Sequence, residues 1–487
     1  MRIGYSENRT PYLEVLDEGR VEAIRQAAFQ ILEKTGARLM HAEARKILAA
    51  AGARVKGEIV KVPRHIVQAA LVSAPKGFTV YNREGRPWMQ VEPGRVYYGT
   101  SSGAPNTLDA ETDELHPTTI RDIELGARVA DALPNIDWVM PFGSVDAPGL
   151  TGDIHEFDAV VRNTLKPVVC CGYSGRGTEL VIEMASAVAG GLDELRERPF
   201  LLTYPEPISP LVFPEMPVDR ILTCAKYFIP QIPSGTTARG TQAPMTVAGA
   251  IALSVAESLF SITLAQLKSP GAPVLMAGNF GTPDMSRGTP TISPPERHLT
   301  TAAQAQVARS FGLPSWGLAG ATESKLLDAQ AGAEAALGLL GQTLGGVTII
   351  HDVGYMDTCM ICAADMLVLG DEIIGQVRRM MRGVPVNDYE LAVDIIDQVG
   401  PGGNFVRLKH TADNCRRDYW KPTGVFYREP YGNWAAAGSK DTKQRVREKT
   451  LKIIAEHKTA ALTAGQEAGL QEVKERALKE LAQMRPY

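Results

Sequence analysis

The sequence predicts an α/β protein, and within that class a (β/α)8 TIM barrel with an N-terminal helical layer and a C-terminal helical extension. From about residue 95 onward, eight short apolar runs alternate with longer segments of helical periodicity, and eight such βα units are what this barrel requires. The runs end in small and polar residues, as strands do at the site-bearing edge of a parallel sheet. No G-x-G-x-x-G motif follows the first run, so nothing favours the alternative, a doubly wound open sheet that binds nucleotides.

Residues 1–92 form the predicted N-terminal layer. Apolar residues recur there at helical spacing in three segments. The turn sequence Asn82-Arg83-Glu84-Gly85 lies between two short apolar runs and indicates a β-hairpin. The three helical segments and the two hairpin runs are Asp17–Gly36, His41–Gly52, Pro63–Ser73, Phe78–Tyr81 and Pro87–Val91.

Residues 93–385 form the predicted barrel, with its active site at the carboxyl-terminal mouth, where the ends of all eight strands converge. The apolar runs are Arg95–Thr100, Ile136–Pro141, Pro167–Gly172, Phe200–Tyr204, Pro230–Gly235, Ala272–Gly278, Pro314–Ala319 and Val347–Asp352. The helical segments lie near Thr118–Ala132, Asp153–Leu165, Gly177–Ala189, Met216–Phe228, Thr246–Lys268, Pro295–Phe311, Asp328–Leu344 and Ala363–Arg382.

The last predicted region, residues 386–487, is a loop and helical extension that packs on the barrel or on another subunit. Its first half is rich in turns and aromatic residues, as in Tyr431-Gly432-Asn433-Trp434. From Lys440 to Met484 the pattern is helical and charged, with pairs such as Glu472 and Arg476 at i,i+4 spacing on a solvated face. Packing of this tail on a second subunit would make the chain a homo-oligomer, which we expect.

The composition argues against several classes of function. The formal net charge of −4 gives the chain no basic field for nucleic acid. We find no apolar run of the roughly 18 residues that span a bilayer, and the N-terminus, Met1-Arg2-Ile3-Gly4, lacks the apolar core of a signal peptide. The sequence therefore predicts a cytoplasmic protein with neither a membrane nor a nucleic acid as partner.

Five of the six cysteines lie in or beside apolar segments, which is typical of buried thiols in a reducing compartment. Cys359 and Cys362 have C-x-x-C spacing, but no second pair accompanies them and they precede a predicted helix, so the pattern is weak support for a metal or redox site. The sequence also contains no H-x-x-x-H or H-E-x-x-H motif, and no metal site is predicted.

The segment from Gly320 to Gly332 is dense in polar residues for its position between an apolar run and an alanine-rich helical pattern. Glu323 and Lys325 lie within it. Two interpretations stay open: the segment is a βα loop that contributes to a site, or it is a helix start with Thr322 or Ser324 as cap and acidic residues near the helix N-terminus.

Small residues and aromatic rings dominate the ends of the eight runs, while lysine and arginine are scarce there. Open space ringed by aromatics suits a methylated ammonium ion, which cannot donate hydrogen bonds and is held by π-faces worth about 2 kcal/mol or more when desolvated. Tyrosine at a strand end is also a common packing residue, and glycine there serves turns. A carboxylate on the same ligand would need donors, for which Asn106, Thr236 and His351 are candidates.

His351 is the single histidine at the end of an apolar run. A lone histidine is more often structural than catalytic. The adjacent Asp352 is nevertheless able to orient the imidazole, as carboxylates orient imidazoles that bind ligands or act in catalysis. Both interpretations of His351 stay open at this point.

Three motifs occur in the predicted mouth: Tyr97-Tyr98-Gly99-Thr100-Ser101, Tyr204-Pro205-Glu206-Pro207-Ile208-Ser209-Pro210-Leu211, and the segment Gly320–Gly332. Together they resemble the trimethylamine methyltransferase family, and the resemblance covers nearly the whole chain. It implies an enzyme that moves a methyl group from a methylated amine to the cobalt of a partner corrinoid protein.

The founding members of that family carry pyrrolysine in the barrel mouth near Gly320–Gly332, where this chain has only standard residues. The chain therefore resembles the non-pyrrolysine branch, whose characterised members demethylate quaternary amines such as glycine betaine. The implied reaction converts glycine betaine to dimethylglycine and cob(I)alamin to methylcobalamin, within one-carbon metabolism of the kind that supports methanogenesis or acetogenesis.

The resemblance further implies that the cobalamin is carried by the separate corrinoid protein and that none is bound permanently by this chain. The usual cobalamin-binding signature, D-x-H-x-x-G, is absent from the sequence. The partners expected are thus a corrinoid protein and a small quaternary amine.

Under this resemblance the predicted site residues fall into groups. The cage for the ammonium ion is Tyr98, Tyr204, Phe280 and Tyr355. The substrate's other contacts are Glu206 and the three candidate carboxylate ligands, Asn106, Thr236 and His351. The candidates for a catalytic role are Glu323 and His351, and Glu323 is expected to pair with Lys325 where pyrrolysine stands in the founding branch.

Three alternatives remain at the sequence level. One is a methyltransferase for another quaternary amine, such as carnitine or proline betaine. Another is a non-catalytic betaine-binding protein, although binding proteins of that kind usually close two lobes around a ligand. The third is a lyase or aldolase that uses Lys325 to form a Schiff base at a barrel mouth.

Overall fold

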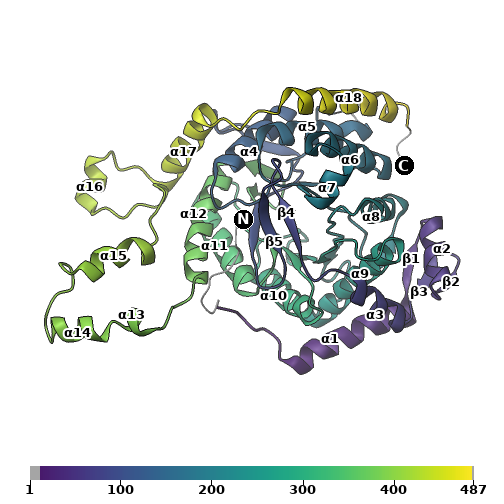
Figure 1. Cartoon of the computed structure of the whole chain (residues 1–487), viewed down its shortest axis with the longest axis horizontal. Coiled ribbons are helices and arrows are strands. Elements are labelled where there is room, and N and C mark those ends of the chain that lie inside the picture. Colours follow the sequence, from purple (N-terminus) through teal and green to yellow (C-terminus); the bar gives the residue numbers. More distant parts are fainter. Residues whose placement is uncertain (1–10, 148, 485–487) are drawn as a thin grey trace.

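The computed structural model describes residues 11–147 and 149–484, so the prediction about the first four residues lies outside the described part. Parallel pairings connect all eight predicted runs in a ring (Figure 1). The second and fifth runs take part only through bridges at Trp138, Val139 and Gln231. The regular strands of the ring are β6 (Tyr97–Thr100), β9 (Val168–Cys170), β10 (Leu201–Thr203), β13 (Met276–Ala277), β15 (Ser315–Leu318) and β16 (Ile349–Val353).

A helix follows each strand position and packs on the outside of the ring (Figure 1), which confirms the predicted α/β class. The first of these helices begins with a capping box in which Thr119 and Asp122 exchange hydrogen bonds. The outer helices are α4 (Ile120–Ala132), α5 (Gly152–Asn163), α6 (Gly175–Ala189), α8 (Glu215–Tyr227), α9 (Val247–Lys268), α10 (Pro295–Ser310), α11 (Ala329–Leu344) and α12 (Ala364–Met381).

The interior of the ring is filled by apolar side chains, among them the fully buried Trp138 and Trp316. The hairpin of β4 (Phe78–Tyr81) and β5 (Pro87–Val91) contributes Val80, Met89 and Val91 to the same cluster. In Figure 1 the hairpin lies across the centre of the ring. The amino-terminal end of the ring is therefore plugged, which leaves the carboxyl-terminal end for a site.

The N-terminal region contains a small sheet that the sequence analysis did not predict, because its strands of three residues are too short to show a period. It pairs β2, β3 and β1 antiparallel and adds β11 from the segment after β10. This region packs on α8 and α9. Its elements are α1 (Glu18–Gln30), η1 (Ile31–Thr35), β1 (Ala37–Leu39), α2 (Ala42–Ala50), β2 (Arg54–Lys56), β3 (Ile59–Lys61), α3 (Arg64–Ser73) and β11 (Val212–Phe213).

Short elements at the strand ends shape the mouth of the ring. Two strands, β12 and β14, pair in parallel, and a second small sheet joins β17, β18, β7 and β8. The bounds of these elements, and of the short helices η2 and α7, are β7 (Asn106–Leu108), β8 (Leu115–Pro117), η2 (Gly149–Thr151), α7 (Leu192–Glu197), β12 (Thr236–Ala238), β14 (Asn279–Gly281), β17 (Tyr355–Met356) and β18 (Ile361–Ala363).

The C-terminal region has two parts that behave differently. Helices α17 (Thr442–Glu456) and α18 (Ala464–Leu481) pack on the outer helices, with Val446, Leu470 and Ala477 buried in the main core. The segment before them extends away from the body (Figure 1), and packing on another subunit stays a prediction for it. Its helices are α13 (Asp388–Leu391), α14 (Val393–Val399), α15 (Lys409–Asp418) and α16 (Tyr431–Ala436).

Helix α9 corrects the expectation that no segment is long and apolar enough to cross a bilayer. With 22 residues, it meets that criterion by length and composition, and it is the only helix among the described residues that does so. Most of the helix is buried between the ring and the N-terminal region. A helix that is apolar on all sides because it is enclosed by protein gives the same signal as a membrane span.

Glu257, in the middle of α9, is a buried carboxyl that holds the segment after β10. Its oxygens accept hydrogen bonds from the Ser209 hydroxyl at 2.8 Å and from the Leu211 backbone N–H at 2.7 Å. Burial raises the pKa of this carboxyl to about 7. In the unfolded chain the pKa of a glutamate is about 4.3. At pH values between about 4.3 and about 7, the folded chain therefore keeps a proton on Glu257 that the unfolded chain has lost. This group therefore lowers stability as pH rises through that window.

We expect Glu257→Gln to remove this pH dependence. The unfolding free energy of the variant minus that of wild type should be higher at about pH 8 than at about pH 5, by on the order of 1–3 kcal/mol. Urea unfolding of both proteins at the two pH values measures this change. The exposed Glu472→Gln serves as the matched control and should show no such gain. Equal pH dependence in wild type and Glu257→Gln would contradict the assignment.

Candidate active site

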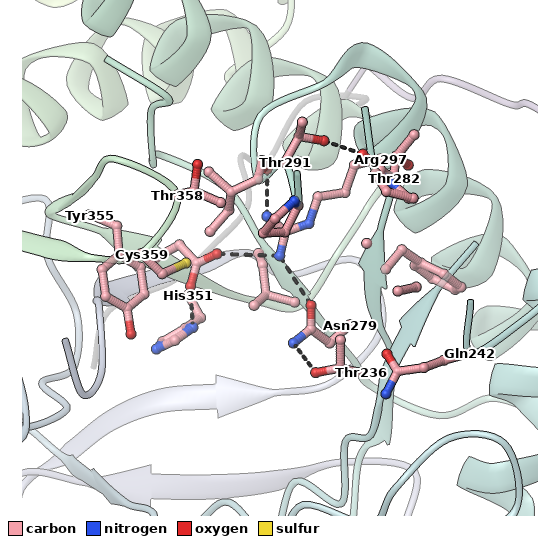
Figure 2. A pocket seen from close by; sticks show the side chains of 18 of the residues that line it. Thr236, Gln242, Asn279, Thr282, Thr291, Arg297, His351, Tyr355, Thr358 and Cys359 are labelled. Carbon is pink, nitrogen blue, oxygen red and sulfur yellow. Dashed lines mark hydrogen bonds and ion pairs between the residues drawn. The ribbon is translucent and has the colours of Figure 1, made fainter. Parts of the chain in front are cut away.

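A cavity of about 620 Å³ opens at the carboxyl-terminal ends of the strands (Figure 2). Pockets of this size, mostly apolar with a few convergent polar groups, are the usual form of a small-molecule site. Residues from separate strand ends and from the segment before α10 form its walls. Those with polar or aromatic side chains include Ser102, Tyr204, Glu206, Thr236, Gln242, Asn279, Thr291, Arg297, His351, Asp352, Tyr355, Thr358 and Cys359.

The imidazole of His351 lies on a stack of aromatic side chains inside the ring. Its centroid is 5.2 Å from that of Trp316 and 5.8 Å from that of Trp138, and both indoles are roughly parallel to it. Tyr204 stacks at 6.3 Å, and Tyr355 meets the imidazole edge-on at 6.1 Å. Since all these rings are buried, they fix the plane of the imidazole at the floor of the cavity.

Opposite charges meet beside this floor. Nδ1 of His351 lies 2.5 Å from Oδ1 of Asp352, and a guanidinium nitrogen of Arg297 lies 3.5 Å from Oδ2 of the same carboxylate. Arg297 also donates to the side-chain oxygen of Asn279 at 3.1 Å, and the Asn279 amide donates to the Thr236 hydroxyl at 3.1 Å. Figure 2 shows these side chains as one connected wall of the cavity.

Several buried polar atoms of this wall have no partner with hydrogen-bond geometry among the described residues. They are Nε of Arg297, both ring nitrogens of His351 and both carboxylate oxygens of Asp352. Buried polar atoms are normally satisfied, so their concentration on one cavity wall indicates a binding function. Asp352 also has a φ of 91°, which is rare for a residue with a side chain, and such strain gathers at functional sites.

Glu206 adds a carboxyl on the side of Tyr204. Glu206 is an exposed residue that lines the cavity. Desolvation by the surrounding side chains raises the pKa of the carboxyl, and the nearby Arg220 and His351 oppose the rise. Burial also raises the pKa of the Tyr204 phenol well above its usual value, so this tyrosine stays neutral.

Hydrogen bonds also fix the hydroxyl of Tyr355 in the wall of the cavity. It accepts a hydrogen bond from the Ser102 backbone N–H at 3.1 Å, lies 2.8 Å from the Ser102 hydroxyl, and donates to the Gly103 carbonyl at 3.2 Å. Six of the predicted substrate-binding residues therefore line one cavity, and their individual roles remain predictions. They are Tyr204, Glu206, Thr236, Phe280, His351 and Tyr355.

Tyr98 does not face the cavity, which corrects its assignment to the aromatic cage. Its ring lies outside the ring of strands, where Arg378 stacks on it at 5.2 Å and the Thr343 hydroxyl lies 2.8 Å from its own. Successive side chains of a strand point to opposite faces. Tyr97 accordingly fills the ring interior, and Tyr98 packs under the outer helices.

Asn106 is not among the residues that line the cavity, which corrects its assignment to the substrate. It belongs to β7, which pairs with β18, and its side-chain amide donates to the Met360 carbonyl at 3.4 Å. Phe280, in β14, lines the cavity. Its side chain is fully buried in the apolar cluster with α8 and α9, and its place in the aromatic cage stays a prediction.

Glu323 clamps two segments at the cavity rim. One carboxylate oxygen accepts hydrogen bonds from the backbone N–H groups of Ile292 and Ser293, the latter at 2.9 Å, and the other accepts from the Thr358 hydroxyl. Ile292 and Thr358 both line the cavity. The carboxylate itself does not, and this geometry favours a positioning role over the catalytic role expected from the sequence.

Lys325 corrects two expectations. It is exposed, and its Nζ lies 2.9 Å from Oδ1 of Asp357, while it meets only the backbone carbonyl of Glu323, at 2.8 Å. The predicted side-chain pair of Glu323 and Lys325 is therefore absent from the described structure. Lys325 is also not among the residues that line the cavity.

The helix-start interpretation of the segment Gly320–Gly332 holds at its end. Asp328 is the N-cap of α11, and its side chain accepts the Ala331 backbone N–H at 3.0 Å. The expected caps Thr322 and Ser324 serve the turn instead. The Thr322 hydroxyl accepts the N–H of Ser324 at 2.9 Å.

The cysteines of the C-x-x-C pair are free thiols. Cys359 lines the cavity, and the Cys362 sulfur lies 3.6 Å from the Ser101 hydroxyl. Burial raises the pKa of both thiols, so they stay protonated at neutral pH. Within the described ranges, no three His, Cys, Asp or Glu side chains are grouped to hold a metal ion.

Sequence reasoning missed four contributors to this site. Arg297 lies in the first turn of an outer helix, and nothing in its local sequence separates it from a surface arginine. Asn279 directly follows the predicted run Ala272–Gly278 and has no role in the sequence analysis. Trp138 and Trp316 lie inside predicted strands, and this position predicts only that they are buried core residues. The signal that was present is the unusual position of two large indoles in runs otherwise made of small and aliphatic residues.

A protein-family model described as "Trimethylamine methyltransferase (MTTB)" matches residues 2–482. The chain belongs to this family. A trimethylamine methyltransferase MttB of Desulfitobacterium hafniense is 32% identical over 435 residues, which cover 89% of this chain and 87% of that protein. A glycine betaine methyltransferase of the same species is 29% identical, with coverage of 95% and 96%. Membership in the trimethylamine methyltransferase family confirms the resemblance seen in the sequence.

The fold agrees with a solved methylamine enzyme. The monomethylamine methyltransferase of Methanosarcina barkeri superimposes with a TM-score of 0.51 and covers 97% of this chain and 90% of that one. The two sequences are 12% identical, so this likeness concerns the fold alone. As a member of the trimethylamine methyltransferase family, the chain is a methyltransferase, and its cavity is the candidate place for the methyl donor.

Proposed function

We propose that the chain transfers a methyl group from a quaternary amine, glycine betaine in the first place, to the Co(I) of a corrinoid carried by a partner protein. The products are dimethylglycine and methylcobalamin. The glycine betaine methyltransferase among the relatives supports this substrate class, and the trimethylamine enzymes among them represent the competing one. All residues of the cavity are standard amino acids.

The observation that carries the proposal is the two-ended character of the cavity. Neutral rings and a carboxyl, from Tyr204, Tyr355 and Glu206, gather around His351. A guanidinium and neutral donors, from Arg297, Asn279 and Gln242, line the wall beyond Asp352. A zwitterion with a quaternary ammonium at one end and a carboxylate at the other matches both sides, because π-faces hold the cation and charged donors hold the anion.

The chemistry asks little of the protein beyond binding. The electron pair of Co(I) forms the new Co–C bond, and the pair of the breaking C–N bond stays on nitrogen, which leaves as a neutral tertiary amine. No side chain needs to gain or lose a proton. The protein contributes orientation and exclusion of water.

The charge of the site bears on the rate. The positive charge on nitrogen disappears in the transition state, so a strong anionic contact to the ammonium would stabilise the substrate more than the transition state. A raised pKa keeps Glu206 protonated over a wider pH range than an ordinary glutamate. The neutral rings of Tyr204 and Tyr355 suit a cation that must lose its charge in the transition state.

The same proposal includes the finer structural predictions. We infer a (β/α)8 barrel over residues 93–385, supported by the ring of parallel pairings, between an N-terminal region (1–92) and a C-terminal region (386–487). We also infer a cytoplasmic protein that meets its corrinoid partner there, an inference compatible with the burial of α9 within the fold.

The alternatives have less support. A Schiff-base lyase is disfavoured because Lys325 is exposed, paired with Asp357 and outside the cavity. A binding protein without catalysis is disfavoured by membership in a methyltransferase family along the whole chain. Carnitine and proline betaine share the zwitterionic pattern, so they belong to the same proposal as further substrates to be compared.

The experiment supplies the chain with a reduced corrinoid protein and, in separate reactions, glycine betaine, carnitine, proline betaine, trimethylamine and tetramethylammonium. The cobalt absorption spectrum follows methyl transfer. We expect the fastest transfer from glycine betaine and slower transfer from trimethylamine, because protonated trimethylamine presents an N–H that the rings leave unpaired, at a cost of about 1–3 kcal/mol. Faster transfer from trimethylamine would overturn the proposal.

A further inference from the structure

The segment of residues 384–437, here called the arm, leaves the body of the molecule after α12 and returns to it before α17 (Figure 1). Its four helices, α13 to α16, bury only the side chain of Asn414 among the described residues. The longest of them, α15, has ten residues. Helices of this length are marginal in water without tertiary packing, so the arm needs a surface that one copy of the chain does not supply.

The exposed surface of the arm is apolar to an unusual degree. Nine aliphatic or aromatic side chains are each more than half exposed, whereas single exposed apolar residues are the norm for a surface. They are Val384, Val386, Tyr389, Leu391, Val393, Ile396, Val406, Tyr419 and Tyr431.

The base of the arm is nevertheless firmly attached. The buried carboxylate of Glu372 on α12 accepts hydrogen bonds from the Thr423 backbone N–H at 3.0 Å and from the Phe426 backbone N–H at 3.2 Å. Arg379, on the same helix, donates to the Asp418 carbonyl at 2.8 Å. The arm is therefore held in a defined direction, with its apolar side chains presented to the outside.

Helix α11, beside α12, adds a second patch of exposed apolar residues. On its outer side Ala333 and Leu337 are exposed, and Leu340, Gly341 and Leu344 continue the same apolar row half-buried, with Leu340 and Leu344 packed on the core. Leu337 is 53% exposed. An outer helix normally shows charges to solvent, as α18 does with exposed Glu472, Glu475 and Lys479.

The arm and the face of α11 lie on the same side of the molecule, since α11 packs on α12 and the arm starts where α12 ends (Figure 1). We propose that two copies of this chain form a two-fold dimer in which the arm of each covers the α11 face of the other. A two-fold axis makes every contact occur twice, so one association covers both arms and both α11 faces. A second copy is the occupant favoured because each copy provides both halves of the contact.

The mass of the protein in solution tests the dimer. By sedimentation velocity and light scattering, wild type should have twice the chain mass of 52.6 kDa. Leu337→Arg on α11 and Ile396→Arg on the arm should each give single chains, because both place a charge in the proposed contact. Val72→Arg, on α3, is the control, since Val72 is 84% exposed and lies in the N-terminal region; it should remain dimeric.

Since Leu337 and Ile396 are 53% and 55% exposed in one chain, circular-dichroism melting of all three variants should show an intact fold. A wild type that has the mass of one chain at all concentrations would overturn the dimer, as would dimers that persist in both variants. A chain that gains mass only when a corrinoid protein is added would assign the arm to that partner and also overturn it.

Cross-linking tests which surfaces meet. Wild-type chains labelled with 14N and 15N are mixed, incubated to exchange subunits and treated with a lysine-specific cross-linker. We expect cross-links of mixed isotope composition between the arm lysines, Lys409 and Lys421, and Lys325, which is exposed just before α11. Mixed cross-links confined to other surfaces would overturn the reciprocal arrangement.

Discussion

Arg297→Met is expected to raise the KM for glycine betaine by about 10- to 100-fold and to leave transfer from tetramethylammonium nearly unchanged. The guanidinium lies in the cavity wall, held by Asn279 and by the carboxylate of Asp352. In the proposed complex it binds the carboxylate of the substrate, and a hydrogen bond between charged groups contributes about 1.5–3 kcal/mol. Each 1.4 kcal/mol corresponds to a tenfold change in affinity.

The comparison of the two donors separates binding from structural damage. Arg297 is buried, so its loss leaves Asp352 with one charged neighbour fewer and lowers stability as well. That loss would affect both donors alike, whereas a missing carboxylate contact affects only the donor that has a carboxylate. Arg297→Lys keeps the charge without the planar fork and should recover part of the affinity. Equal losses for glycine betaine and tetramethylammonium would remove Arg297 from the proposed contact.

His351→Phe should lower kcat/KM for glycine betaine by about 10- to 100-fold and melt at a higher temperature than His351→Ala. Phenylalanine keeps a flat ring against Trp138 and Trp316, so the floor of the cavity stays packed. It removes the two ring nitrogens that face Asp352 and the cavity and have no hydrogen-bond partner in the described structure. Steady-state transfer rates and calorimetric binding of glycine betaine measure the effect.

His351→Ala provides the other half of this test. It removes the nitrogens and also the ring, and deleting a buried aromatic ring costs about 3–5 kcal/mol of stability. We expect the alanine variant to lose activity to a similar extent as His351→Phe and to melt at a lower temperature. If His351→Phe keeps wild-type activity, the imidazole serves packing alone.

The local pattern of apolar and polar residues was sufficient to predict most strands of the ring and its outer helices. The predicted run Pro314–Ala319 contains β15, and the predicted helix Asp328–Leu344 is α11 with its cap. These elements follow from apolar periodicity and from a cap residue, which are properties of neighbouring residues. Their convergence on one cavity follows from the parallel order of the strands, which the alternation of runs and helices already implies.

The direction of individual side chains did not follow from the sequence. Tyr97 and Tyr98 are adjacent and chemically equal. Only the rotation of the strand about its own axis decides that the side chain of Tyr97 points into the ring and that of Tyr98 points outward. The chain reveals that rotation when polar residues alternate with apolar ones. A strand buried on both faces has no such alternation, and β6 is buried along its whole length.

Long-range partners were equally hidden. Arg297 reaches the cavity from a helix because Asn279 and Asp352, 18 and 55 residues away along the chain, receive its guanidinium. The arm looked like an ordinary turn-rich tail, because its exposed valines and isoleucines are visible as uncovered only when the rest of the chain is folded.

The hairpin of β4 and β5 has a consequence for the order of events in the proposed reaction. By filling one end of the ring with Val80, Met89 and Val91, it leaves the amine and the cobalt a shared route through the other end. A carrier protein docked on that opening covers the cavity, so the amine must be in place before the carrier arrives. The demethylated amine then departs after the carrier has withdrawn, and a plug far from the chemistry imposes a compulsory sequence of arrivals and departures.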